Sequence, residues 1–474
     1  MVECRSILFV RRCRKYLSLI SQNPSSNTER RAVVSLASIY MIRMLGLFMI
    51  LPVFSIYAVD LEGSQATLIG VAIGIYGLGQ ALFQLPYGLL SDRFGRKPLI
   101  MSGLFLFALG AVIAAMSTSI YGVIIGRALQ GSGAVAAVTM ALLADLTKEE
   151  NRTKAMAAVG MSIGIAFALA LVLGPLLATY MGLQGLFWLT AGLALIAMYI
   201  CWFVVPNPQV QVHQEGALPV KSQLRDVLLN PELARLNIGI FVLHSVLTAS
   251  FVVLPLALVE YGHFSLEKHW QVYLPVLLGS FIAMLPLMIL AEKKNQVKNV
   301  FLFCLIMLMI GMVGLGFGYQ NFSALVFFLL VFFFGFNLLE ALLPSLISKI
   351  APANNKGSAM GVYSTAQFLG VFVGGSLGGF IYGAAGIGAV FLSLAGLTVI
   401  WFFISLGMKN PKKLKSYKLS LANVKEARVR EIIKMLESFE GVEEVLFASE
   451  EDAAYLKVDH NTFDDTVLRE FSQG

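Results

Sequence analysis

The sequence predicts an all-α membrane protein with twelve transmembrane helices in two six-helix pseudo-repeats, followed by a small α+β domain. Three observations support this. Of the 474 residues, 57% are hydrophobic and only 13% are charged, about half the charged share of a soluble protein. Long apolar runs recur along the chain, and features of its first half return roughly 200 residues later. From Leu419 onward the composition becomes acidic, which indicates a second physical environment.

Twelve apolar runs are each near the ~20 residues that a helix needs to cross ~30 Å of hydrocarbon. They are continuously apolar rather than alternating, so a transmembrane barrel is excluded. We place them at 34–58, 68–90, 98–117, 120–145, 155–179, 184–205, 236–259, 270–291, 299–318, 323–347, 358–384 and 388–407.

The runs divide the chain into six segments. In order these are a basic N-terminal tail (1–32), a six-helix bundle (33–205), a cytosolic linker (206–235), a second six-helix bundle (236–407), a basic linker (408–415) and a soluble domain (416–474). The apolar stretch in the tail is too short for a signal peptide, so the tail is interpreted as mobile, as an over-extended start, or as a membrane-surface anchor.

The short loops predict the orientation, because cytosolic loops are enriched in Lys and Arg. Acidic side chains dominate the loops after odd-numbered helices, namely Asp60, Glu62, Glu260 and Glu267, with Lys268 as the one basic residue. Basic side chains occupy the loops after even-numbered helices, among them Arg93, Arg152, Lys154, Lys293, Lys294, Lys298, Lys349 and Lys356. The even loops and both termini are therefore expected in the cytosol.

The two bundles share sequence features at a near-constant offset. Leu85-Pro86 returns as Leu285-Pro286, and Ala155-Met156 returns as Ala359-Met360. Six-helix halves related by an axis along the membrane normal are one way in which secondary transporters are built.

A ten-residue motif lies in the turn between the second and third predicted helices. Its defining positions are Gly88, Asp92, Arg93, Gly95, Arg96 and Lys97. This motif resembles the signature of the major facilitator superfamily at every defining position. The glycines permit a tight turn and close helix approach.

The resemblance implies a conformational latch at this turn. Asp92 would lie against the N-terminus of the eleventh helix, where the helix dipole favours an anion. Arg96 would pair with Asp145 at the end of the fourth helix. The alternative is that Arg93, Arg96 and Lys97 only determine topology.

Two further segments resemble motifs of the family. Arg127 and Gln130 match a fourth-helix motif whose buried arginine is implicated in proton transfer. Gly174-Pro175 matches part of an antiporter motif in the fifth helix, although Ala170 stands where a glycine is expected. A proline kink without a transport role is the alternative for this pair. The resemblance, closest to drug-efflux-like members with a small C-terminal domain, runs from about Arg30 to the end. It implies that the membrane is an inner (plasma) membrane.

Ionisable residues within the predicted spans are functional candidates, because charge is costly in a membrane. They are Arg43, Arg127, His244 and Glu340. We expect Glu340 to bind the coupled proton and Arg43 or His244 to compete with that proton; a static ion pair is the alternative. Neutral side chains that could line a substrate cavity are Asn337, Tyr76, Gln80, Gln84 and Gln130, unless each only bonds a neighbouring helix.

The soluble domain is predicted to contain a strand, a helix, two strands and a second helix at Phe463–Phe471. This order resembles a ferredoxin-like module. Relatives of that module which bind soft metals carry a CxxC pair, and this chain has none. We expect no metal, no cofactor and no nucleic acid as partner. Residues 416–474 regulate transport, bind a cytosolic ligand, mediate self-association, or form a solvated appendage.

The leading functional prediction is proton-coupled efflux of a small amphipathic or drug-like molecule by alternating access, without enzymatic activity. A symporter or facilitator that imports a nutrient is the second reading. A membrane sensor that signals through its C-terminal domain is a third, from another class. The expected partners are the lipid bilayer, the small-molecule substrate and protons.

Overall fold

The computed structural model describes residues 26–207, 221–293, 296–351, 356–410, 414–420, 426–448, 453–459 and 462. The chain divides into two compact units. The large unit comprises Met1–Met288 and Val300–Met408, and the small unit comprises Ile289–Asn299 and Lys409–Gly474. Residues 1–25 of the predicted tail, residues 208–220 of the predicted linker and the predicted helix Phe463–Phe471 lie outside the described residues.

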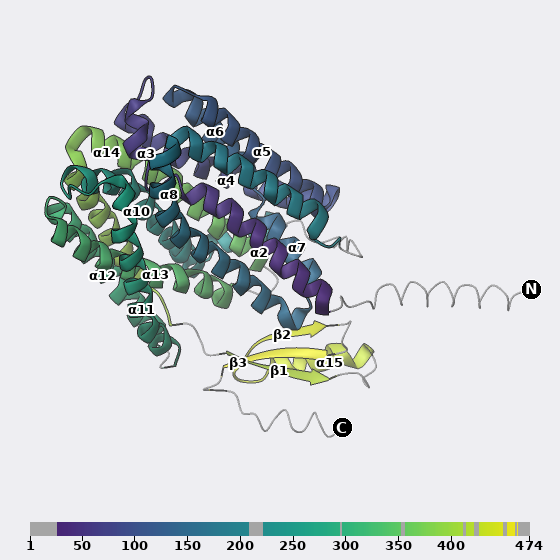
Figure 1. Ribbon diagram of the computed structural model, residues 1–474. Helices are drawn as coiled ribbons and strands as arrows, with labels where there is room; N and C mark the ends of the chain where they lie inside the picture. Colours follow the sequence, from purple (N-terminus) through teal and green to yellow (C-terminus); the bar gives the residue numbers. More distant parts are fainter. Residues whose placement is uncertain are drawn as a thin grey trace, which may run out of the picture. The chain divides into compact units, whose positions relative to one another are not determined.

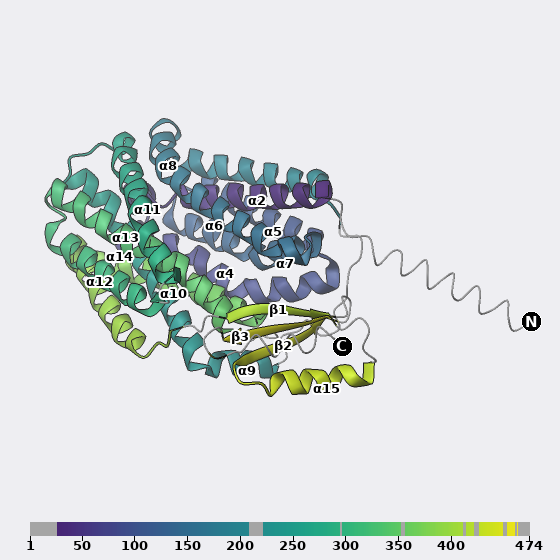
Figure 2. The ribbon, with the colours of Figure 1, turned by 90° about the horizontal axis from the view of Figure 1, so that it is seen from below.

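The described part of the large unit is built from helices (Figures 1 and 2). Their bounds are α2 Ser26–Phe48, α3 Phe54–Tyr57, η1 Ala58–Asp60, α4 Ala66–Phe94, α5 Arg96–Met116, α6 Ile120–Ser132, α7 Ala136–Leu146, α8 Glu149–Tyr199, η2 Ile200–Val204, α9 Lys221–Leu229, α10 Pro231–Glu260, η3 Leu266–Lys268, α11 Trp270–Lys293, α12 Val297–Gly318, α13 Phe322–Ile350 and α14 Lys356–Leu406.

Within the described residues, ten helices are long and apolar enough to cross a membrane. Two of them, Lys154–Val204 and Gly357–Leu406, have 51 and 50 residues, more than twice the ~20 residues that one crossing needs. Each contains one residue with non-helical backbone angles, Gly182 (φ 67°) in α8 and Gly386 (φ 82°) in α14. Glycine adopts such positive φ values without the steric cost of a Cβ atom.

Contacts with α2 show that α8 reverses at Gly182. The ring of Phe167 lies 5.1 Å from that of Phe48, and the Thr190 hydroxyl lies 3.3 Å from the Gly46 carbonyl oxygen. A straight helix would separate residues 167 and 190 by roughly 35 Å, at ~1.5 Å per residue. Segments on both sides of Gly182 therefore run along the same helix.

The second long helix, α14, reverses at Gly386 by the same reasoning. A side chain at Gly370 would collide with the backbone of Phe241, while Trp401 packs against Gly239. Both ends of this stretch thus approach one turn of α10. The two reversal points, Gly182 and Gly386, are 204 positions apart, which is also the offset of the repeated Ala-Met pair.

The loops gather at two ends of the helices, as their charges predict. At the first, which we call the acidic-loop end, Phe264 stacks on Phe322 at 5.2 Å, and Leu266 packs against a cluster of Val53, Ala178 and Leu186.

At the other end, which we call the basic-loop end, Arg31 donates to the Val204 carbonyl oxygen at 2.8 Å and Lys97 donates to that of Val205 at 2.9 Å. The backbone N–H of Lys148 donates to Glu29 at 3.0 Å. Helix α2 therefore begins at Ser26, inside the predicted tail, and its first turns are fixed by polar contacts.

Helices α4 and α14 form a close seam between the two halves of the large unit. A Cβ atom added at Gly70 or Gly74 would meet the backbone of α14 at Gly375 or Phe372. Small residues allow this approach, which supplies van der Waals contact where lipid offers no hydrophobic driving force between helices.

The small unit contains the β1 strand Leu414–Ser420, the α15 helix Glu426–Glu437, the β2 strand Val442–Ala448 and the β3 strand Ala453–Asp459. The sheet order is β1-β3-β2, and β3 is antiparallel to both neighbours. Such an order requires the chain to cross over between β1 and β2, and α15 makes that connection. Leu419, Leu436 and Leu456 are members of its apolar core.

Two local predictions differ from the observed elements. The second bundle, predicted to begin at residue 236, begins with α10 at Pro231, inside the predicted linker, and α9 precedes it. Asn230 separates them because its side chain caps the backbone N–H groups of Glu232 and Leu233. The fourth predicted span, 120–145, is broken into α6 and α7 at residues 133–135.

Candidate functional site

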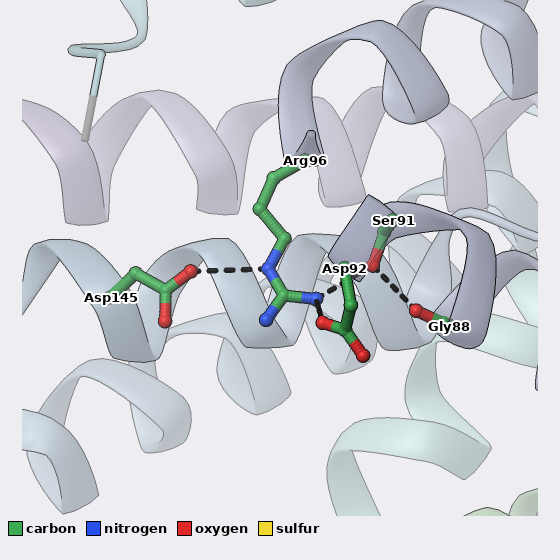
Figure 3. A network of polar contacts seen from close by, with 5 residues as sticks. All are labelled: Gly88, Ser91, Asp92, Arg96 and Asp145. Carbon is green, nitrogen blue, oxygen red and sulfur yellow. Dashed lines mark hydrogen bonds and ion pairs between the residues drawn. The ribbon is translucent and has the colours of Figure 1, made fainter. Parts of the chain in front are cut away.

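Three of the predicted latch residues, Asp92, Arg96 and Asp145, meet at the basic-loop end (Figure 3). Helix α4 ends at Phe94. Gly95 follows with a φ of 91°, which turns the chain so that α5 begins directly at Arg96. The Arg96 guanidinium lies between two carboxylates, 2.5 Å from Asp92 and 3.1 Å from Asp145. It also donates to the Ser91 hydroxyl at 2.6 Å, and that hydroxyl donates to the Gly88 carbonyl oxygen. The ion pair expected between Arg96 and Asp145 is present.

Other basic residues of the same motif have different contacts. The Lys97 ammonium donates to the Val205 carbonyl oxygen and to the Asn207 side chain, both at 2.9 Å. It therefore holds the end of η2, a π-helical turn, rather than the Asp92–Arg96–Asp145 cluster. The Arg93 guanidinium lies 5.5 Å from the Phe94 ring centroid.

A second cluster is formed by two buried arginines around one phenol. Arg43 donates to the Tyr76 hydroxyl at 2.8 Å, and the Arg127 guanidinium lies 5.3 Å from the centroid of the same ring. Arg127 also donates to the carbonyl oxygens of Ala72 and Ile73, each at 3.3 Å. Among the described residues, neither arginine is paired with a carboxylate. Both charges are instead solvated by backbone oxygens and by an aromatic face.

The break between α6 and α7 lies beside this cluster. Arg43 donates to the Gly133 carbonyl oxygen at 3.2 Å, and Gln80 donates to that of Gly131 at 3.0 Å. An interrupted membrane helix leaves backbone groups that need partners. Arg43 and Gln80 supply them, so this group, with Arg127, Tyr76 and Gln130, supports the break.

A third group lies in the other half of the large unit. Glu340 Oε2 lies 3.8 Å from His244 Nδ1, and His244 Nε2 lies 2.8 Å from Gln367 Nε2. The Glu340 side chain is 39% exposed, whereas that of His244 is 11% exposed. Neither Glu340 Oε2 nor His244 Nδ1 has a hydrogen-bond partner. A separation of 3.8 Å is within the range of an ion pair but too long for a hydrogen bond.

The structure thus separates candidates that the sequence groups together. Glu340 is close to His244, while the contacts of Arg43 are with Tyr76 and Gly133. Asn337 donates to the Ser280 hydroxyl at 2.8 Å and so joins two helices. Gln84 is buried, and its carbonyl oxygen has no partner.

The Gly174-Pro175 pair lies at a close helix crossing. A Cβ atom at position 174 would collide with the Met49 carbonyl oxygen of the α2–α3 connection. Pro175 lies inside α8. This geometry gives the glycine a packing function in the described structure.

One residue of the third group was not among the sequence candidates. Gln367 carries no charge, and the search within the spans considered ionisable side chains first. A lone amide within the apolar run 358–384 is the signal that identifies it.

Comparison with known proteins shows the family. Residues 36–365 and 238–439 match the model of the Major Facilitator Superfamily. The matches cover more than half of the chain, which therefore belongs to this superfamily of membrane transporters. Such a protein acts in a lipid bilayer on a small-molecule substrate.

A curated relative specifies the membrane. The chain is 49% identical over 431 residues to the inner membrane transport protein YajR of Escherichia coli (strain K12). The alignment covers 91% of this chain and 94% of YajR. Together with the apolar helices, this similarity identifies a multi-pass inner-membrane transporter.

Solved structures agree on the fold at low sequence identity. A bacterial homolog of the human lysosomal transporter Spinster, in an inward-facing and occupied conformation, matches with a TM-score of 0.68 at 12% identity. The match covers 81% of this chain and 97% of that chain. The human organic anion transporter MFSD10 matches with a TM-score of 0.60 at 19% identity, covering 80% and 99%.

Proposed function

We propose that this transporter exports a small amphipathic or drug-like molecule in exchange for protons. The observation that carries the proposal is the Glu340–His244 pair, which lies mid-helix. The Glu340 side chain is 39% exposed, while its Oε2 atom and His244 Nδ1 are buried, lie 3.8 Å apart and have no hydrogen-bond partner. An acid buried in a membrane protein usually has a partner that fixes its charge. This acid has an accessible face and a loose neighbour, so its charge can change during a transport cycle.

We assign the chain twelve membrane crossings, with the basic-loop end in the cytosol. Ten apolar helices, two of which fold back at Gly182 and Gly386, support this number. The basic residues of the even loops support the orientation. Both termini then lie in the cytosol.

The exchange follows from this arrangement. When Glu340 is ionised and open to the basic-loop end, a substrate enters from the cytosol and contacts the site. After the two halves reclose around it, the site opens at the acidic-loop end. A proton from that side binds a Glu340 oxygen, the substrate leaves, and the return step releases the proton to the cytosol. Each half-reaction moves one proton onto or off the same carboxylate.

The Asp92–Arg96–Asp145 cluster serves as the latch of this cycle. Arg96 joins the α4–α5 turn to the end of α7 through charge-assisted bonds. Loss of the cluster would alter the balance between the conformations of the cycle.

Glu340→Gln in proteoliposomes tests the proposal. Gln keeps the shape of the side chain and cannot ionise, so pH-driven efflux of a fluorescent amphipathic dye such as ethidium should fall at least tenfold. The thermal unfolding midpoint should stay close to that of the parent. Glu267→Gln, at the acidic-loop end, is the matched control and should transport normally. Undiminished pH-driven transport by Glu340→Gln would remove Glu340 from the coupling step.

We further propose that the small unit is a ferredoxin-like domain that regulates transport or mediates self-association. The β1-β3-β2 order, with α15 crossing from β1 to β2, supports this fold. Deletion of residues 416–474 should change the transport rate or the oligomeric state. If it changes neither, the domain is an appendage.

The same proteoliposomes distinguish two other functions from proton-coupled efflux. A nutrient importer would accumulate substrate with an inward proton gradient rather than expel it. A sensor would bind the dye without moving it across the membrane.

A further inference from the structure

We propose that four phenylalanines, Phe48, Phe167, Phe251 and Phe333, form an aromatic gate that closes the transport pathway on the acidic-loop side of Glu340. Phe167 is its central residue. The proposal rests on alternating access as proposed above, and it adds residues that the sequence did not single out. It assigns to these rings the separation of the proton site from one side of the membrane.

The gate is defined by three ring contacts that Phe167 makes. Its centroid lies 5.1 Å from that of Phe48, 6.3 Å from that of Phe251 and 6.5 Å from that of Phe333. The first two contacts are edge-to-face, with interplanar angles of 86° and 88°. Such geometry matches the favoured arrangement of aromatic pairs.

These contacts join the two halves of the molecule. Phe48 lies on α2 and Phe167 on α8, whereas Phe251 lies on α10 and Phe333 on α13. One side chain of the first half thus touches two helices of the second. A ring in this position separates when the halves move apart and repacks when they close.

The gate lies on one side of the candidate proton site. On α10, Phe251 is about two turns from His244 in the direction of Glu260; on α13, Phe333 is about two turns from Glu340 in the direction of Phe322. These two helix ends both belong to the acidic-loop end, where Phe322 stacks on Phe264. Both gate residues of the second half are therefore displaced toward that end.

Exposure differs between the gate and Glu340. Phe251 and Phe333 are each 0% exposed and Phe48 and Phe167 are half-buried, whereas the Glu340 side chain, two turns from the rings of the second half, is 39% exposed. In the proposed gate the rings close the path beyond Glu340, and the carboxylate is reached from the basic-loop side.

Other contacts close the same end around the gate. The α4–α14 seam is closed at Gly70 and Gly375, and Leu266 packs against the cluster of Val53, Ala178 and Leu186. These contacts involve segments at the rim, while the Phe167 cluster lies deeper along the helices. The gate is thus the layer nearest to Glu340.

Side-specific labelling of a cysteine at position 340 tests the gate without measuring transport. The parent is Glu340→Cys with Cys4 and Cys13 replaced by serine; Cys201 and Cys304 are buried and stay. The reagent is the membrane-impermeant thiol reagent methanethiosulfonate ethyltrimethylammonium, applied to right-side-out and inside-out vesicles. We expect fast reaction from the basic-loop side and at least tenfold slower reaction from the acidic-loop side.

Opening the gate should remove this asymmetry. Phe167→Ala should raise the acidic-loop rate at least tenfold, while Phe167→Tyr, which keeps the ring, should leave it low. The matched control is Phe334→Ala, on the same helix as Phe333, because that ring faces Phe303 of α12 at 6.4 Å. If Phe167→Ala does not fold, Phe333→Leu tests the same contact from the other half.

The outcomes distinguish the gate from the proposed function. Equal labelling of the parent from both sides, or no change on removing a gate ring, overturns the gate whatever Glu340 does in transport. A transporter that keeps pH-driven efflux as Glu340→Gln, but shows ring-dependent labelling, loses the coupling assignment and keeps the gate.

Discussion

The two polar clusters in the membrane-spanning unit differ in the partners that their charged groups have. In the first half, Arg43 and Arg127 are 2% and 1% exposed, and their guanidinium groups donate to the Tyr76 hydroxyl and to backbone carbonyl oxygens, although Arg43 Nε has no partner. In the second half, Glu340 is accessible, and its Oε2 atom has no hydrogen-bond partner. The first cluster therefore has the properties of a framework, and the second contains the acid that we propose binds the coupled proton.

This difference shows that an ionisable residue in a membrane helix has more than one possible use. All four candidates look alike in the sequence, because each is a lone ionisable side chain in an apolar run. Their surroundings separate them. Arg127 and Arg43 hold a broken helix against its neighbours, while Glu340 and His244 approach each other without binding.

The largest loss of stability is expected from a substitution that forces α4 away from α14. Helix α4 carries Ala72 and Ile73, the acceptors of Arg127, and its Gly74 faces the backbone of α14. Gly74→Leu should prevent the seam from closing, at a cost of about 3 kcal/mol or more, since overpacking against backbone leaves little room to adjust.

The yield and thermal midpoint of purified protein measure this. Gly88→Leu is the control, because a Cβ atom there meets nothing within 4 Å. Equal stability of the two variants would mean that the seam is not needed to hold the halves together.

A substitution inside the first cluster should have the next largest effect. Tyr76→Phe removes the acceptor of Arg43 and leaves a buried cation with one bond fewer, which costs about 1.5–3 kcal/mol for a bond to a charged group. The thermal midpoint should fall, while the pH dependence of transport should keep its shape. A shifted pH profile would instead make the first cluster part of the proton pathway.

Two substitutions on α4 test whether side chains of that helix support the break between α6 and α7. Gln80 donates to the Gly131 carbonyl oxygen, so Gln80→Leu should leave a buried acceptor unsatisfied at about 1–3 kcal/mol. Gln84 lies about one turn further along the same helix with an unpaired carbonyl oxygen, so Gln84→Leu should be neutral or stabilising. Thermal unfolding of both variants, compared side by side, decides the point; a larger loss for Gln84→Leu would contradict the role given to the break.

The smallest effect on stability is expected at the latch. Asp145 is 39% exposed, and an exposed ion pair contributes about 0–1 kcal/mol. Asp145→Asn should leave the thermal midpoint nearly unchanged and act on the transport rate, because it alters the balance between conformations. A large loss of stability would mean that the latch, like the first cluster, stabilises the fold.

Much of the architecture could be predicted from the sequence, because lipid imposes a simple rule on helix length and charge. The start of α2 at Ser26 was missed because Arg30 and Arg31 lower the hydropathy there, although Arg31 is held by the end of η2. The break in the fourth span was also missed, since residues 133–135 contain no proline. Its cause is the set of side chains from other helices, which no local pattern records.

The candidate site was predicted in part. Glu340 and His244 were candidates because of their residue type, and the family resemblance implied the pairing of Arg96 with Asp145. The sequence did not predict that Arg43 lies apart from Glu340. The position of a residue along its helix gives its depth in the membrane, but not the neighbouring helix that its side chain faces. The aromatic gate was hidden for another reason: with 34 phenylalanines in the chain, no single one stands out before the helices are packed.

The sharp reversals at Gly182 and Gly386 have a practical consequence for handling the protein. Helical segments lie directly on either side of each glycine, so neither reversal offers an extended stretch to which a protease or an antibody can bind. Limited digestion from the acidic-loop end should therefore cut at 61–65 or 261–265, and an epitope tag meant for that face belongs in one of those two segments.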